Sequence, residues 1–135
     1  MVLGGCGVGS GGDRDDVRQV VSSYLGASGQ GNGRRACAFL VPALRREMAR
    51  RARRKGMRGC PELLGTRIRY RLASLPADLR ADVGDALSDR DAIDVAMRGD
   101  DHAVATLEMP HHALADARFE LVRTRQGWRI ERVSG

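Results

Sequence analysis

At residues 93–109 the chain reads IDVAMRGDDHAVATLEM, and its hydrophobic period changes there. Ile93, Val95 and Met97 alternate with polar or small residues, which is the period of two expected for a half-buried strand. Gly99-Asp100-Asp101 then interrupts the alternation with residues that favour a turn, and apolar residues resume after it. The segment therefore predicts two strands joined as a β-hairpin.

The C-terminal residues repeat this pattern. Phe119 and Leu121 lie on one side of a predicted strand over residues 117–124, and Gln126-Gly127 predicts the turn that follows. Residues 128–132 alternate again and predict the last strand. The two hairpins together predict a four-stranded antiparallel meander.

Before the hairpins, apolar residues recur with a helical period. Val17, Val21, Tyr24 and Leu25 belong to one apolar stripe, which predicts a helix over residues 13–28. Prolines divide the segment after it, because proline removes a helical hydrogen bond and is tolerated in a first turn. We predict further helices from residue 34 with a break at Pro42, from Cys60, and from Pro76 through Val83, closed by Gly84. Helices followed by strands indicate the α+β class.

The chain has 135 residues, of which 42% are hydrophobic and 30% charged, as expected for one folded domain. No apolar run approaches the about 18 residues that a membrane-spanning helix needs. The formal net charge of +6 arises in one basic segment, residues 45–58, which has a single acid, Glu47. Its basic residues are Arg45, Arg46, Arg50, Arg51, Arg53, Arg54, Lys55 and Arg58.

This basic segment has three interpretations. An exposed helix end, stabilised by cations near the negative end of the helix dipole, is the one we favour. A surface for anionic lipid headgroups is the second. Nucleic acid is the third, and we do not expect it as a partner because the segment lacks the aromatic residues that stack on bases.

The N-terminal residues Leu3-Gly4-Gly5-Cys6 resemble a bacterial lipobox, in which Cys6 would carry a lipid. An export signal needs about 7 to 15 apolar residues before such a box, so this interpretation requires a true start upstream of Met1. Residues 1–12 would then be the anchor and its Gly-rich tether, and residues 13–135 a single extracytoplasmic domain. The same glycines satisfy G-x-G-x-x-G, but no strand precedes them, so we reject a dinucleotide site and expect no cofactor.

Five short segments carry a resemblance to a known family. They are Val17–Leu25, Gly33–Leu40, Cys60, Phe119–Val122 and Gly127–Ile130. In this order they resemble the nuclear-transport-factor-2-like (cystatin-like) α+β domains, in particular the small exported lipoproteins of actinobacteria built on that fold. Together they span nearly the whole chain.

The resemblance implies a curved sheet that wraps around a long helix and leaves a cone-shaped pocket. Tyr24, Phe119 and Trp128 would line such a pocket here. Some proteins of this fold are isomerases or cyclases and many only bind or assemble, so the fold does not assign a function. The hairpin that larger relatives carry between the second and third helices is missing, which argues against a deep enzyme-like pocket.

We assign no catalytic residue. Isomerases of this fold place a phenol and carboxylates inside the cone, and Tyr24, Tyr70 and Asp94 are the candidates here. Asp94 has the opposite parity to Ile93, so we expect it to face solvent. We expect Tyr24 to be a core residue whose hydroxyl is hydrogen-bonded.

The histidines do not indicate a metal site. His111 and His112 are adjacent and follow Glu108 closely, while His102 opens a strand. Zinc needs three or four converging ligands, and adjacent side chains of an extended loop point in opposite directions. We therefore expect no bound metal.

If Cys6 carries a lipid, Cys37 and Cys60 remain as a pair. An exported domain resides where disulfides persist, so we predict that these two are bonded. The alternative is two separate buried thiols in a cytosolic protein.

We therefore predict a membrane-tethered extracytoplasmic binding or accessory domain rather than an enzyme. Its ligand or protein partner is not identified by the sequence. One alternative is a small enzyme of the ketosteroid-isomerase type that uses Tyr24 or Asp94. The other is a basic cytoplasmic adaptor that binds nucleic acid through the basic segment.

Overall fold

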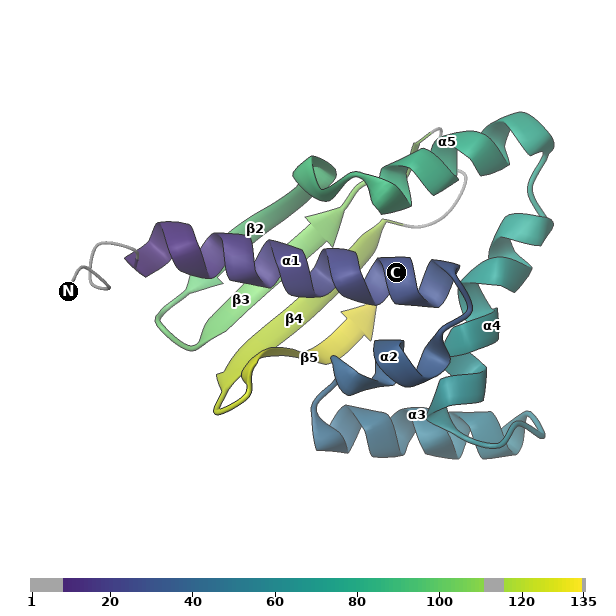
Figure 1. The fold of residues 1–135 in the computed structure, drawn as a ribbon, viewed down its shortest axis with the longest axis horizontal. Coiled ribbons are helices and arrows are strands. Elements are labelled where there is room, and N and C mark those ends of the chain that lie inside the picture. Colours follow the sequence, from purple (N-terminus) through teal and green to yellow (C-terminus); the bar gives the residue numbers. More distant parts are fainter. Residues whose placement is uncertain (1–8, 111–115, 135) are drawn as a thin grey trace.

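The computed structural model of the chain describes residues 9–110 and 116–134. Helices come first and an antiparallel sheet second (Figure 1), so the predicted α+β class is confirmed. The described helices are α1 (Gly9–Gly29), α2 (Gly33–Ala38), α3 (Pro42–Arg54), α4 (Cys60–Ala73) and α5 (Ala77–Ser88), followed by a 3-10 turn at Arg90–Ala92. The described strands are β2 (Ile93–Arg98), β3 (His102–Leu107), β4 (Ala117–Thr124) and β5 (Gly127–Ser134).

The four described strands form one open sheet in the order β2-β3-β4-β5. The first hairpin pairs Arg98 with His102, and Gly99, at φ 73°, adopts the left-handed conformation that favours glycine. β4 and β5 are in register apart from one irregularity between Glu120 and Leu121. The predicted meander is confirmed, with each strand within two residues of its expected limits.

α1 lies across one face of the sheet (Figure 1). Val17 and Val21 of this helix are fully buried, as are Ala105 and Leu121 of the sheet. Asp94 faces the opposite way and is exposed, as its parity predicts. Because successive strand residues point to opposite faces, the alternation gives the sheet one apolar face and one largely polar face.

The helices α2, α3 and α4 lie beside the sheet (Figure 1), and the segment between α2 and α3 contacts its edge. The Val41 N–H donates to the Ile130 carbonyl at 2.9 Å, and the Ile130 N–H donates to the Phe39 carbonyl at 2.8 Å. Gly33 of α2 packs so closely on α4 that a Cβ atom there would lie 1.6 Å from the Pro61 carbonyl oxygen. Main-chain bonds therefore hold the helices to β5, and backbone contact holds them to one another.

A disulfide joins Cys37 of α2 to Cys60 at the start of α4, which confirms the predicted pair. The two Cα atoms are 6.3 Å apart, and the bond closes a loop that contains α3. Disulfides persist in oxidising compartments, so the bond indicates an extracytoplasmic environment. Among the described helices, none combines the length and the hydrophobicity needed to cross a bilayer. Cys6 lies outside the described residues.

Two predicted helix limits are wrong. α1 begins at Gly9 rather than Asp13, so the last residues of the expected tether are helical, and Asp13 inside the helix pairs with Arg123 of β4. α5 continues through Gly84 to Ser88. Val83 is fully buried, and burying such a side chain offsets the roughly 1 kcal/mol that an internal glycine costs a helix.

We expect Gly33→Ala to lower the free energy of unfolding by about 3 kcal/mol, because the new methyl group overlaps the backbone of α4. Gly26→Ala is the matched control, since a Cβ atom at this exposed helical position meets nothing within 4 Å. This control should stabilise the protein by up to about 1 kcal/mol. Urea denaturation of the two variants measures both effects, and equal stabilities would contradict the close approach of α2 and α4.

Replacing both Cys37 and Cys60 by serine should lower the free energy of unfolding by about 3 kcal/mol, because the unfolded chain loses a closed loop. Urea denaturation of the oxidised parent and of the double variant gives the difference. Peptide mass mapping after alkylation, with and without reductant, identifies the bond. Free alkylation of both thiols in protein purified from its natural compartment would overturn the pairing and the argument for export.

Candidate functional site

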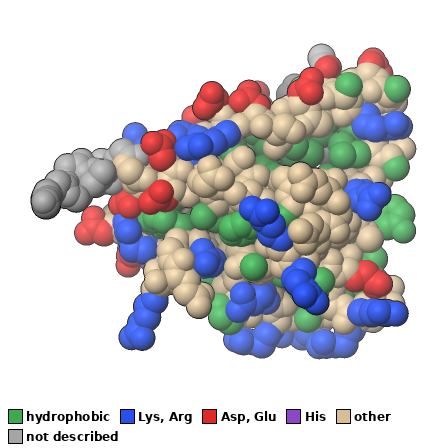
Figure 2. Space-filling view, in the orientation of Figure 1, with side chains coloured by type: hydrophobic (Ala, Val, Ile, Leu, Met, Phe, Trp, Pro, Cys, Tyr) green, Lys and Arg blue, Asp and Glu red, His purple; other side chains and the backbone are tan. Residues whose placement is uncertain are grey.

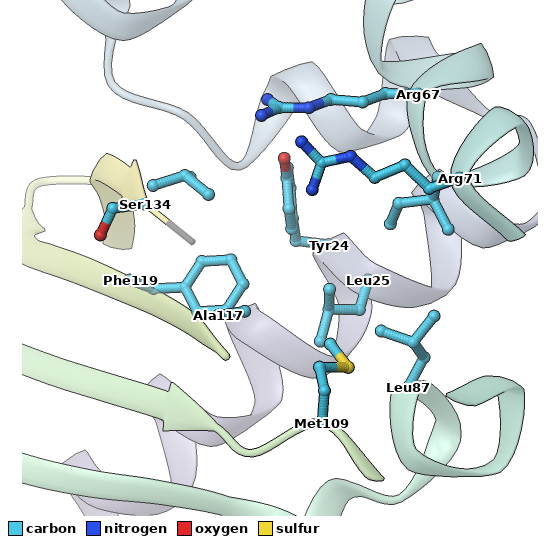
Figure 3. Close-up of a pocket in the computed structure, with 11 residues that line it drawn as sticks. Tyr24, Leu25, Arg67, Arg71, Leu87, Met109, Ala117, Phe119 and Ser134 are labelled. Carbon is cyan, nitrogen blue, oxygen red and sulfur yellow. The ribbon is translucent and has the colours of Figure 1, made fainter. Parts of the chain in front are cut away.

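A small pocket, which we call the apolar pocket, lies where β4 and β5 meet α1, α4 and α5, and its volume is about 80 Å³. Leu25 of α1, Leu87 of α5 and Met109 after β3 contribute aliphatic and thioether groups to its lining. Figure 3 shows these side chains around one common space. Such a lining favours an apolar group of a ligand.

Two aromatic side chains from different layers meet in this pocket. Tyr24 of α1 and Phe119 of β4 have ring centroids 5.8 Å apart at an interplanar angle of 73°. This edge-to-face arrangement is a favourable geometry for aromatic pairs. The structure thus brings Tyr24 and Phe119 together, although they are 95 positions apart in sequence.

Trp128, the third expected pocket residue, lies elsewhere. It is paired in register with Arg123 near the β4–β5 turn, whereas Phe119 is paired with Val133 at the other end of the hairpin. Four residues of strand separate Phe119 from Arg123, which is roughly 13 Å. Trp128 is 3% exposed, and the Arg123 guanidinium carbon lies 4.9 Å from its ring centroid. Trp128 is therefore buried but does not line the apolar pocket.

Arg67 and Arg71 of α4 complete the lining of the apolar pocket. They are four positions apart, so they lie on the same face of the helix. Figure 3 shows both guanidinium groups near the hydroxyl end of Tyr24. Within the part of the chain that the structure describes, neither guanidinium forms an ion pair with a carboxylate.

The electrostatics of these groups follow from burial. Burial lowers the pKa of Arg67 below its ordinary value, and the positive charge of Arg71 lowers it further. Burial raises the pKa of the Tyr24 phenol above 10.0, and the positive charge of Arg67 opposes that change. Since a guanidinium remains protonated in proteins, the site presents two positive charges beside a neutral phenol.

A second depression, the basic hollow, shares the arginine pair and has a volume of about 290 Å³. Arg51 and Lys55 of α3 and its C-cap line it together with Arg67 and Arg71. Arg51 also pairs with Glu47 one turn earlier on α3. The arginine pair of α4 therefore lies between an apolar lining and a cationic one.

The basic segment forms the outer face of α3 and the turn after it. Met48 and Ala52 of this helix are buried, so its apolar side packs inward. Figure 2 shows Lys and Arg side chains gathered along the lower edge of the molecule, where α3 runs. Arg46, Arg50, Arg53, Arg54, Lys55 and Arg58 are exposed, and Arg45 and Arg51 are half-buried. Most of these side chains therefore lie at the surface, and binding of anionic lipid headgroups there stays an alternative interpretation.

The remaining candidates do not join this site. Asp94 lies on the polar face of the sheet, away from Tyr24, and Tyr70 is 70% exposed beside the basic hollow. The imidazole Nδ1 of His102 donates a hydrogen bond to the Asp101 carboxylate at 2.9 Å at the surface. His111 and His112 lie outside the described residues. Among the described residues, no group of three His, Cys, Asp or Glu could hold a metal ion.

Arg67 and Arg71 are not among the site residues that the sequence predicts. Their spacing of four on the third helix was a usable signal, but the richer basic segment of residues 45–58 obscured it. Nothing in the sequence shows that α4 lies against the same end of the sheet as Phe119. The packing of α4 beside α1 and the sheet brings this pair to the apolar pocket.

Comparisons of this chain with protein-family models, with curated proteins and with solved structures find no match. The function has to be inferred from the geometry of the site.

Titration by ultraviolet absorbance should show that the pKa of Tyr24 lies above the ordinary value of 10.0 for a tyrosine, because burial disfavours its phenolate. Tyr24→Phe leaves Tyr70 as the other tyrosine, so the difference between the two proteins isolates Tyr24. The folded state then holds a proton that the unfolded state releases, so stability falls as pH rises from 10.0 through the folded pKa. A pKa of Tyr24 at or below 10.0 would contradict its burial.

Proposed function

We propose that this protein is an extracytoplasmic binding domain, tethered to the membrane through Cys6, whose ligand inserts a small apolar group into the apolar pocket. The observation that carries this proposal is a pocket whose apolar lining comes from both the helices and the sheet. The disulfide supports the location, because such bonds persist outside the cytoplasm. We further propose that the fold is a nuclear-transport-factor-2-like cone, with α1 as the long helix.

The position of the pocket suits a tethered domain. Gly9 begins α1 and Tyr24 lies 15 residues further along it, which corresponds to about 22 Å of helix. A tether attached before Gly9 would leave the apolar pocket at the far end of the helix. The anchor and the ligand site would then not interfere with each other.

The alternative functions receive less support from the geometry. Tyr24 lines the apolar pocket, but Asp94 lies on the opposite face of the sheet, so the two cannot act on one substrate. The described lining of the pocket contains no carboxylate. A cytoplasmic nucleic-acid adaptor does not account for the disulfide.

Monomeric decyl glucoside, which has a neutral headgroup, should shift the amide NMR signals of residues around the apolar pocket. Ala117→Phe fills part of this pocket and should weaken binding by about tenfold or more, since excluding two methylene groups removes roughly 1.6 kcal/mol. Ala96→Phe places the same side chain on an exposed position of β2 and should bind as the parent does. Absence of shifts in the parent, or equal weakening in both variants, would overturn the proposal.

A further inference from the structure

We infer that Arg67 and Arg71 recognise the anionic headgroup of a single-chain amphiphile whose apolar end enters the apolar pocket. This inference rests on the proposed function and adds the chemical class of the ligand. The chemistry required of the headgroup is a phosphate or another compact anion that two guanidinium groups can contact together.

Arg67 carries a charge that is partly withdrawn from water, and the neighbouring Arg71 is exposed. Two other arginines, on α1 or paired with it, have carboxylate partners: Arg18 donates to Asp15 and to the Ile93 carbonyl, and Arg123 pairs with Asp13. Arg67 is half-buried, yet among the described residues it has no carboxylate partner. Removing a charge from water is costly unless an opposite charge compensates it, so an anion bound there would stabilise the site.

Arg67 and Arg71 lie at the boundary between two depressions of the surface. Arg67 and Arg71 line both the apolar pocket and the basic hollow. A ligand held at this boundary meets carbon on one side and the cations Arg51 and Lys55 on the other. A free inorganic anion would leave the apolar pocket unused, and an uncharged chain would leave the arginines unpaired. An amphiphile contacts the apolar pocket with its chain and the two arginines with its headgroup.

The size of the apolar pocket and the shape of the guanidinium groups also favour an amphiphile with one aliphatic chain. The apolar pocket, at about 80 Å³, accommodates the end of one aliphatic chain rather than a fused-ring skeleton. The guanidinium fork donates two parallel hydrogen bonds to phosphate or carboxylate oxygens, which fixes the headgroup more firmly than a single point charge would. Figure 3 shows the two forks near the Tyr24 hydroxyl, which provides a further polar group at the same place.

The test compares decyl phosphate with decyl glucoside, both monomeric, by NMR titration of the full chain. Decyl phosphate should bind about tenfold or more tightly, since hydrogen bonds to charged groups contribute more than those to neutral groups. Arg67→Gln with Arg71→Gln should remove this preference, so that the variant binds decyl phosphate and decyl glucoside with equal affinity. If the parent does not bind decyl glucoside at all, the proposed function is wrong. If the parent binds decyl glucoside and decyl phosphate equally, only the inference about the anionic headgroup is wrong, so the two failures are distinguishable.

Arg46→Gln with Arg50→Gln is the matched control, because it removes the same charge from exposed positions of α3. It should preserve the preference for decyl phosphate. Equal loss in both double variants would show a general effect of net charge and would overturn the inference. Inorganic phosphate should compete with decyl phosphate in the unmodified protein, which tests the site without any substitution; absence of competition would also overturn it.

Vesicles distinguish the two sources of such a headgroup. If the source is the membrane, vesicles containing phosphatidylglycerol should bind the parent more tightly than pure phosphatidylcholine vesicles, and Arg67→Gln with Arg71→Gln should abolish the difference. If the source is a soluble amphiphile, the double variant should lose only its preference for decyl phosphate. Both results support the anionic headgroup, and equal binding of decyl phosphate and decyl glucoside by the parent overturns it.

Discussion

Val17 and Val21 of α1 bury their side chains against the inner face of the sheet, and the other elements take their positions from this contact. The helix is anchored at several points along its length. Near its start Asp13 pairs with Arg123, and in its middle Arg18 donates to the Ile93 carbonyl. Burial of apolar area supplies most of the stabilisation in such a layer, and the polar bonds fix the direction of the helix on the sheet.

The helices beyond the sheet edge are held by a different set of constraints. The bridge at Ile130 fixes the start of α3, and the contact between Gly33 and Pro61 leaves no space for a larger residue. The Cys37–Cys60 disulfide then closes the loop around α3. These constraints orient α4, so that its arginines reach the pocket formed by α1 and the sheet.

The site combines features that folding alone does not favour. A half-buried guanidinium without a carboxylate partner among the described residues costs stability, and it lies beside a pocket with an apolar lining. Proteins accept such costs at positions where function requires them. This cost at Arg67 is the physical reason for proposing the ligand beside Arg67, Arg71 and Tyr24 rather than along the basic face of α3, where most of the cations are exposed and well solvated.

The sequence by itself determined the α+β class, the order of helices and strands and the basic segment, because these depend on local periodicity, on proline and glycine positions, and on the order of charges along the chain. The sequence predicted the Cys37–Cys60 pair only through the assignment of Cys6 to a lipid, and the tertiary structure shows the bond itself. The tertiary structure decided which inward residues meet: Phe119 joins Tyr24 while Trp128 does not, although both share the inner face. It also brought Arg67 and Arg71 to the pocket. Parity and helical spacing specify the face on which a side chain lies, whereas the packing of distant elements specifies its neighbours.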